Sequence, residues 1–254
     1  MINLQDKIDM MTSKFQKIFN NHKSVIGMIH VEALPGTPKH HLSIPQIIDK
    51  ALDEAKLYKE GGIDALMIEN MHDVPYLKND VGHEISSLMT LIAYLIKQET
   101  SLPLGIQILA GANKAAMAAA LNSGADFIRA EGFVFGHIAD EGYIDSNAAD
   151  LLRYRKQIGA DHIAVFTDIK KKHSSHAITQ DLDITEMAHA AEFFLADGVI
   201  VTGMHTGAAA DTSDLEKLQN TTRLPKIVGS GITIDNIQDF INLADAFIVG
   251  SYFK

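Results

Sequence analysis

The stretch GGIDALMIEN, residues 61–70, contains the repeating unit that decides the fold: a glycine and an aspartate followed by a short apolar run. The same junction recurs as GAD at residues 124–126 and 159–161, with looser copies at 196–198 and 244–246. The glycine suits the left-handed backbone position that ends a helix, and the apolar run suits a parallel strand buried on both faces. We therefore predict helices alternating with strands, and a structural role for the aspartates at the amino ends of the strands.

Eight short apolar runs are spaced along the chain like strands, and the segments between them have helical character. In residues 85–96, for example, apolar side chains recur at the i, i+3, i+4, i+7 spacing of a helix that lies on a sheet. Eight such units predict an α/β fold, a single (β/α)₈ TIM barrel, and 254 residues are enough to build one. The predicted strands are Val25–His30, Ala65–Asn70, Leu104–Leu109, Phe127–Ala130, Ile163–Thr167, Gly198–Thr202, Lys226–Gly229 and Ala246–Gly250.

Residues 1–22 are predicted to form an extra amphipathic helix ahead of a barrel that spans residues 23–254. Its apolar stripe has helical spacing and consists of Leu4, Ile8, Met11, Phe15 and Phe19. The sequence stops at Lys254, shortly after the eighth run, so we expect the eighth outer helix to be missing or truncated. Either the leading helix covers that flank or the flank is bare. A helix that buried its stripe in a second copy would make the chain a homo-oligomer.

The composition argues against several classes of function. A net charge of -10 argues against nucleic-acid binding, which relies on clustered Lys and Arg. The absence of cysteine excludes disulfides, thiolate metal sites and cysteine nucleophiles. No apolar run approaches the roughly 20 residues of a membrane-spanning helix, and no secretory leader opens the chain, so a soluble, cytoplasmic protein is expected. The run Lys170-Lys171-Lys172 is interpreted as a solvated loop.

Polar residues follow the predicted strands, at the end where barrels of this type build their active sites. The catalytic candidates are Glu69, Asp168, Arg129, His30 and Lys170. Strand alternation predicts that Lys170 shares a face with Asp168. Two carboxylates beside a guanidinium can supply an acid, a base and charge stabilisation, but an ion-pair network that only stabilises the barrel fits the same residues equally well. The other polar residues at these ends are Glu32, Asn70, Asp73, Gln107, Asn113 and Glu131.

A phosphate-binding pocket is predicted at the carboxyl ends of the last two strands. Glycine lets backbone N–H groups approach an anion closely, and this fold commonly holds phosphate at those two strand ends. Thr233 and Asp235 look like the start of a helix whose amino terminus adds partial positive charge. The alternative is that the glycines only make tight turns. The predicted phosphate-binding residues are Gly229, Ser230, Gly231, Gly250 and Ser251, with Thr202 and Gly203 at the end of the sixth strand.

A divalent metal is possible at the same mouth, although no cofactor is predicted. Carboxylates and imidazole suit several divalent ions, and Glu69, Asp168 and His30 supply both kinds of ligand. Nothing in their spacing is diagnostic of a metal site.

A further set of motifs runs through residues 23–254. They are GMIH at 27–30, LPGTP at 34–38, EN at 69–70, DVP at 73–75, PLG at 103–105, FIR at 127–129, LRYR at 152–155, FTDIKKKH at 166–173, VGSG at 228–231 and VGS at 249–251. Together they resemble the BtpA family, which implies a phosphate-binding barrel of the ribulose-phosphate-binding type. The family is named for a cyanobacterial factor needed for photosystem I accumulation, but its occurrence without photosynthesis implies a more general activity. Many members have Asn where this chain has Glu131, and members usually continue past the last Gly-Ser.

Two hypotheses of function follow. The first is an enzyme of the isomerase, lyase or hydrolase class that acts on a small phosphorylated metabolite, either a sugar phosphate or a nucleotide-like compound. Glu69 or Asp168 would serve as acid or base, and Arg129 or Lys170 would stabilise developing negative charge. The second is a non-catalytic assembly or stability factor, as in photosystem I biogenesis, that uses the barrel as a scaffold.

Overall fold

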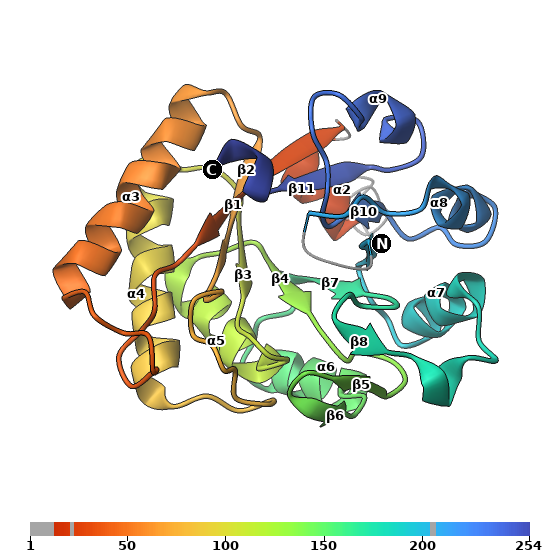
Figure 1. The fold of residues 1–254 in the computed structure, drawn as a ribbon, viewed down its shortest axis with the longest axis horizontal. Helices are drawn as coiled ribbons and strands as arrows, with labels where there is room; N and C mark the ends of the chain where they lie inside the picture. The colour runs from red at the N-terminus through yellow and green to blue at the C-terminus, as the bar shows by residue number, and fades with distance from the viewer. Residues whose placement is uncertain (1–12, 21–22, 204–206) are drawn as a thin grey trace, which may run out of the picture.

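The computed structural model describes residues 13–20, 23–203 and 207–254, and at its centre is a closed barrel of eight parallel strands (Figure 1). Around the barrel the strands are ordered β1-β11-β10-β9-β7-β4-β3-β2. Each strand therefore pairs with the preceding and following barrel strands in the chain, and the predicted TIM barrel is confirmed. The strands are β1 (Ser24–His30), β2 (Ala65–Glu69), β3 (Leu104–Gln107), β4 (Phe127–Ala130), β7 (Ala164–Asp168), β9 (Gly198–Val201), β10 (Lys226–Val228) and β11 (Ala246–Val249).

In the described residues, an α-helix follows each barrel strand except β11, which leads into the 3₁₀ turn η2 (Ser251–Phe253). No helix in those ranges is long and apolar enough to cross a membrane. The outer helices are α3 (Ile44–Glu60), α4 (His83–Thr100), α5 (Asn113–Ser123), α6 (Ala148–Gln157), α7 (Ile184–Phe193), α8 (Thr212–Gln219) and α9 (Ile237–Phe240).

The aspartates of the repeated junction tie neighbouring strands together at the amino end of the barrel. Asp64, Asp126, Asp197 and Asp245 accept hydrogen bonds from the backbone N–H groups of Val25, Leu104, Val165 and Lys226 at 2.8, 2.8, 2.9 and 2.8 Å. Asp161 is different, because it is exposed and pairs with Lys156 instead. The predicted structural role is therefore confirmed for the first four aspartates.

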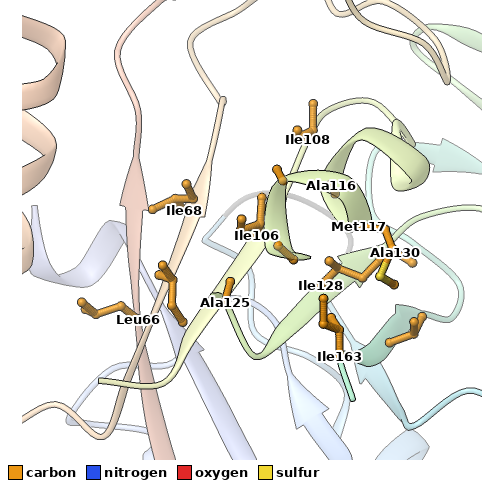
Figure 2. Packing of buried hydrophobic residues seen from close by; sticks show 14 of the residues in the cluster. Leu66, Ile68, Ile106, Ile108, Ala116, Met117, Ala125, Ile128, Ala130 and Ile163 are labelled. Atoms are coloured by element: carbon orange, nitrogen blue, oxygen red, sulfur yellow. The ribbon is translucent and has the colours of Figure 1, made fainter. Parts of the chain in front are cut away.

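Two apolar layers hold the barrel together. The outer layer lies between strands and helices, where Ile106 of β3 and Ile128 of β4 pack beneath Ala116 and Met117 of α5 (Figure 2). The inner layer fills the barrel and includes Phe127 and Phe166, whose ring centroids are 5.2 Å apart. Gly105 makes room for this layer, since a Cβ at that position would lie 2.1 Å from the ring of Phe127. The barrel interior is thus a packed core, and a cavity remains at its carboxyl end.

The described part of the N-terminal segment includes a short helix, α2 (Lys14–Phe19), that packs against the barrel's inner layer. Phe15 and Phe19 are buried there, with ring centroids 5.9 Å from those of Phe166 and Phe127, respectively. Lys14 forms an ion pair with Asp197 at the amino end of β9. The described helix α2 therefore closes the amino end of the barrel and does not cover the flank beside β11 and β1. Because this part of the stripe is buried in its own barrel, it gives no reason to expect an oligomer; Leu4, Ile8 and Met11 lie outside the described residues.

The flank beside β11 and β1 is covered in part by side chains from α3 and η2. The Tyr58 hydroxyl donates to the carbonyl of Met28, and its ring lies in edge contact with Phe253 at a centroid distance of 5.6 Å. Lys254, after η2, forms an ion pair with Glu54 of α3 at 2.9 Å. The other alternative was a bare flank. These contacts cover part of the flank, so it is only partly exposed.

A small antiparallel sheet is inserted after β4 and β7, at the carboxyl end of the barrel (Figure 1). Its strands are β5 (His137–Ala139), β6 (Gly142–Ile144) and β8 (Ser174–Ser175), and the 3₁₀ helix η1 (Ala177–Thr179) follows β8. The turn between β5 and β6 brings Asp140 and Glu141 to the cavity wall. This sheet was not predicted, because its strands are too short to leave a periodic pattern.

Candidate active site

A cavity of about 540 Å³ opens at the carboxyl end of the barrel, a volume typical of small-molecule sites. His30, Glu69 and Asp168 are the last residues of β1, β2 and β7, and Arg129 is the last but one of β4. All four therefore lie at the same end of the barrel, as predicted. The predicted residues that line the cavity are His30, Glu69, Arg129, Gly229, Ser230, Gly231, Gly250 and Ser251.

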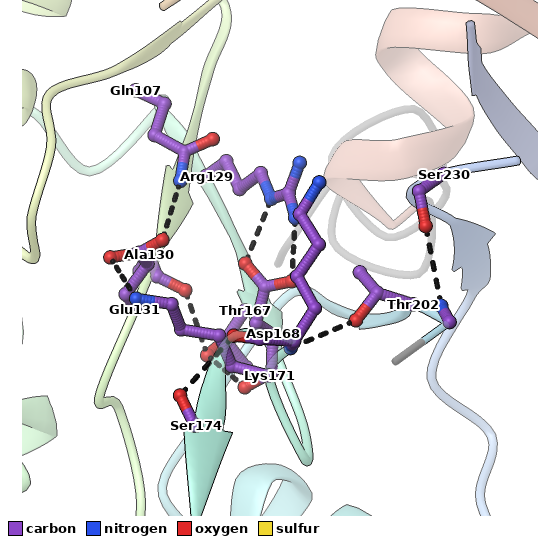
Figure 3. A network of polar contacts seen from close by, with 12 residues as sticks. Gln107, Arg129, Ala130, Glu131, Thr167, Asp168, Lys171, Ser174, Thr202 and Ser230 are labelled. Carbon is purple, nitrogen blue, oxygen red and sulfur yellow. Dashed lines mark hydrogen bonds and ion pairs between the residues drawn. The ribbon is translucent and has the colours of Figure 1, made fainter. Parts of the chain in front are cut away.

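Arg129 and Asp168 form a buried ion pair with two parallel hydrogen bonds (Figure 3). The guanidinium donates through Nε and one terminal nitrogen to the two carboxylate oxygens, at 2.8 and 2.7 Å. Burial alone would lower the pKa of Arg129, but Asp168, together with Glu69 and Glu131, outweighs this effect and the pKa is raised. Because both oxygens of Asp168 are used, its main effect is to hold a permanently charged Arg129 in the wall of the cavity.

Glu131 stands at the centre of a second polar cluster (Figure 3). One of its carboxylate oxygens accepts from Gln107 Nε2 at 3.0 Å and the other from Lys171 Nζ at 3.1 Å. Burial raises the pKa of Glu131, and the nearby Lys171 opposes that shift. Asn113 donates to the backbone carbonyl of Glu131 at 2.7 Å and so fixes the segment that carries it.

Glu69 differs from Asp168 and Glu131 because its side chain has no hydrogen bond or ion pair within the described part of the chain. Burial raises its pKa, and the charges of Arg129 and Lys172 only partly offset that shift. The carboxyl group lines the cavity. A carboxyl with a raised pKa and free oxygens is suited to act as a general acid or base.

Two further titratable groups line the cavity near the end of β1. Burial lowers the pKa of His30 from 6.5 to about 3, with Lys254 and His72 adding to the shift, so its imidazole is neutral. Burial also lowers the pKa of Lys172, with Arg129 as the next cause. Lys172 forms no ion pair with any described residue. Within the described ranges, the Lys172 amine therefore lines the cavity without a carboxylate partner and can meet an anionic ligand.

The lysine run after β7 is placed differently from the prediction. Lys170 adopts a left-handed backbone conformation, with φ of 49°, and does not line the main cavity. Lys171 and Lys172 line it instead, and the Lys171 side chain is only 10% exposed. The interpretation of this run as a solvated loop is therefore wrong for these two residues. The expectation that Lys170 shares a face with Asp168 rested on strand alternation, which ends with β7 at Asp168.

The glycine-containing ends of β10 and β11 line one side of the cavity, and neighbouring groups shape them. The Ser230 hydroxyl accepts from Gly203 N–H at 3.2 Å and donates to the Ala208 carbonyl at 3.0 Å. Ser230 and Gly203 are thus used to join the β9 and β10 loops. Thr202 accepts from the backbone N–H of Lys172. Neither Thr202 nor Gly203 lines the cavity.

Gly231 is required by packing inside the protein. Its φ is 70°, and a Cβ there would lie 2.3 Å from the backbone of Ala208. The helix expected to begin near Thr233 begins at Ile237, because the Thr233 N–H donates to the Asn236 side chain and a turn forms before the helix. The backbone N–H groups of Gly231 and Ser251 make no hydrogen bond to any described residue. Both residues line the cavity.

The side chains considered for a metal are not assembled into a ligand set. Among the described residues, no three His, Asp or Glu side chains come together in a group that could hold a metal ion. Asp168 already binds Arg129 through both oxygens. Glu69 and His30 line the same cavity at the ends of neighbouring strands.

Sequence reasoning missed Lys171, Lys172 and Glu141, and it placed Gln107 and Glu131 at strand ends without giving them a role. The sequence could have indicated a role for Gln107 and Glu131, since Gln107 ends β3 and Glu131 directly follows β4. Nothing in the sequence indicated Glu141, because its position depends on the inserted sheet.

Comparison with known proteins gives the relationships of the chain. Residues 21–254 match the model of the BtpA family. An uncharacterized protein of Caenorhabditis elegans, F13E9.13, named as mitochondrial, is 49% identical over 94% of this chain and 88% of its own length. The photosystem I biogenesis protein BtpA of Synechocystis is 35% identical over 93% of this chain and 82% of its own length. Among solved structures, a proposed phosphonomutase from Burkholderia cenocepacia is similar in fold, with a TM-score of 0.60 and 16% sequence identity. The match covers 91% of this chain and 90% of the phosphonomutase chain. The chain belongs to the BtpA family.

Proposed function

We propose that this chain is an enzyme that acts on a small phosphorylated metabolite by acid–base chemistry. The observation that carries the proposal is one cavity that contains a free carboxyl with a raised pKa, Glu69, and a free cation, Lys172. A substrate phosphate needs a cation to bind it, and a reacting carbon needs an acid or base beside it. The two groups must therefore lie in one cavity but at different positions.

The phosphate is proposed to bind between the ends of β10 and β11 and Lys172. The unpaired backbone N–H groups of Gly231 and Ser251 are suitable donors to an anion. Lys172 lies near enough to His30 to lower its pKa, and a Cβ at Gly250 would lie 3.4 Å from the imidazole of His30. These proximities support a place for Lys172 beside the ends of β10 and β11, which carry the unpaired N–H groups.

Glu69 is proposed to move the proton, and Arg129 to stabilise negative charge that develops on the substrate. Arg129 is well suited because Asp168 fixes its orientation and the dry surroundings strengthen its field. Asp168 is the weaker candidate for a base, since both of its oxygens are used. His30 is neutral and can donate or accept a hydrogen bond in the same cavity.

Calorimetric titration of inorganic phosphate and of phosphate monoesters tests the binding half of this proposal. Lys172→Met should weaken phosphate binding by about tenfold, the loss expected for a charged hydrogen bond, whereas Lys114→Met on the exposed start of α5 should not. Weakening by Lys170→Met but not by Lys172→Met would show that the lysine predicted from sequence is the correct one. Absence of phosphate binding to the parent protein would refute the proposal.

The catalytic half is tested with Glu69→Gln once a turned-over compound is found by screening phosphorylated metabolites. The variant should bind that compound about as well as the parent and lose at least about a hundredfold in kcat, because general acid–base groups contribute that much or more. Retained turnover would exclude Glu69 as the acid or base.

A non-catalytic scaffold is the second candidate function, and one surface feature favours it. Phe193, Phe194 and Leu195, where α7 ends, are 81%, 44% and 67% exposed and form an apolar group. If scaffolding is the only role, a cell that depends on this chain is rescued as fully by Glu69→Gln as by the parent.

The cytoplasmic location and the possible divalent metal remain predictions. One relative is named as mitochondrial.

A further inference from the structure

The two sides of the cavity differ in their hydrogen-bonding chemistry. In a ring of eight strands, the strand directly across from any other is four positions away, so β3 lies across from β10 and β4 lies across from β11. The β10 and β11 side offers donors, namely the free backbone N–H groups of Gly231 and Ser251. The opposite side, at the ends of β3 and β4, has the carboxylate and amide oxygens of Glu131 and Gln107 beside Arg129, which is paired with Asp168. This contrast distinguishes the two ends of a ligand.

Gln107, at the end of β3, presents an acceptor without a partner. Its Nε2 faces Glu131, whose other carboxylate oxygen is held by Lys171, so the amide nitrogen must point to Glu131 and the amide oxygen away from it (Figure 3). Gln107 is 2% exposed and lines the cavity. Its Oε1 is buried and has no hydrogen-bond partner among the described residues. A buried acceptor without a partner calls for a donor, and a ligand in the cavity that Gln107 lines can supply one.

Glu141 supplies a second acceptor of the same kind. It lies in the turn between β5 and β6 and lines the same cavity. Its Oε2 is also buried without a hydrogen-bond partner in the described ranges. Glu141 lies near Lys171 and Tyr76, because its charge raises the pKa of both. It therefore belongs to the side of the mouth that also contains the Gln107 cluster.

We infer that the ligand carries hydroxyl groups on the part remote from its phosphate, and that these donate to Gln107 Oε1 and Glu141 Oε2. This inference rests on the proposed function and narrows its substrate class to polyhydroxylated phosphate monoesters, that is, sugar phosphates. A phosphate ester with an alkyl chain leaves both oxygens unpaired when it excludes water from the cavity, and a site built to meet hydroxyl groups rejects such an analogue. Gln107 and Glu141 are thus specificity-determining residues.

The test compares ribose 5-phosphate with n-pentyl phosphate, which has the same number of carbons and the same phosphate but no hydroxyl group. Calorimetry should show that the parent binds ribose 5-phosphate about tenfold more tightly or better. Gln107→Met and Glu141→Met should each reduce that preference to about threefold or less while keeping the affinity for n-pentyl phosphate and for inorganic phosphate. Gln98→Met, at an exposed position of α4, is the matched control and should keep the full preference.

Each outcome decides a different point. Equal affinity of the parent for the two esters, or an unchanged preference in both cavity variants, overturns the inference and leaves the phosphate site standing. No binding of inorganic phosphate or of either ester to the parent overturns the proposed function and the inference together. If circular dichroism shows that Gln107→Met does not fold, Glu141→Met decides, because Glu141 belongs to the turn between β5 and β6 and not to the barrel core.

Discussion

The ion pair of Arg129 and Asp168 should couple strongly in a double-mutant cycle. The two side chains are 4% and 0% exposed and are joined by two hydrogen bonds. Asp168→Asn leaves a buried guanidinium without its counter-charge, and breaking a buried pair in this way costs about 3–5 kcal/mol. Arg129→Met leaves the opposite charge unpaired, at a similar cost. The double variant removes both charges, so it should be at least about 2 kcal/mol more stable than the sum of the single effects predicts.

Urea unfolding followed by circular dichroism measures these free energies without a substrate. The coupling should change little between about 0.05 and 0.5 M salt, because water and ions are excluded from the pair. Additive effects, within about 0.5 kcal/mol, would show that the two residues are independent and would refute the argument that Asp168 holds Arg129. In that event Asp168 would return as a candidate base.

Two further predictions concern stability. His30 is neutral in the folded protein, where its pKa is lowered from 6.5 to about 3. Its contribution to the free energy of unfolding is therefore fully present above pH 6.5 and is lost as the pH falls toward 3. Between about pH 7 and pH 4.5, urea titration should therefore show that the parent loses about 2 kcal/mol more than His30→Asn, and equal losses would contradict this. Asp126→Ala should cost about 1–2 kcal/mol by removing the acceptor of Leu104 N–H, whereas Asp161→Ala should stay within about 0.5 kcal/mol, and similar costs in thermal or urea unfolding would refute the distinction.

The barrel could be predicted because its pattern is local. A parallel strand buried on both faces gives a continuous apolar run, and β2, β4, β9 and β11 each follow a junction whose aspartate also bonds to the preceding strand. The inserted sheet could not be predicted, since β5, β6 and β8 contain two or three residues each. Nor could the position of α2, because an apolar stripe indicates that a helix is buried but not against which surface.

The candidate site could be predicted only as far as the strands extend. Glu69, Arg129 and Asp168 lie at the carboxyl end because strand geometry places them there. Beyond Asp168 the alternation of faces ends, and the left-handed backbone at Lys170 turns the following residues back toward the cavity. The sequence therefore indicated that a lysine follows this strand, but the choice between three successive lysines depends on the conformation of a single residue.

Gly231 shows why a glycine motif is weak evidence for an anion site. Glycine is needed wherever a backbone approaches something closely, and a sequence does not say whether that neighbour is a ligand or the protein itself. Here the neighbour is the backbone of Ala208, which would lie 2.3 Å from a Cβ at this position, so Gly231→Val would disrupt the β9 and β10 loops before it touched a ligand. Loss of phosphate binding in that variant would consequently say little about the anion. The free amides of Gly231 and Ser251 and the charge of Lys172 carry the argument instead, and Lys172→Met tests it without disturbing the turn.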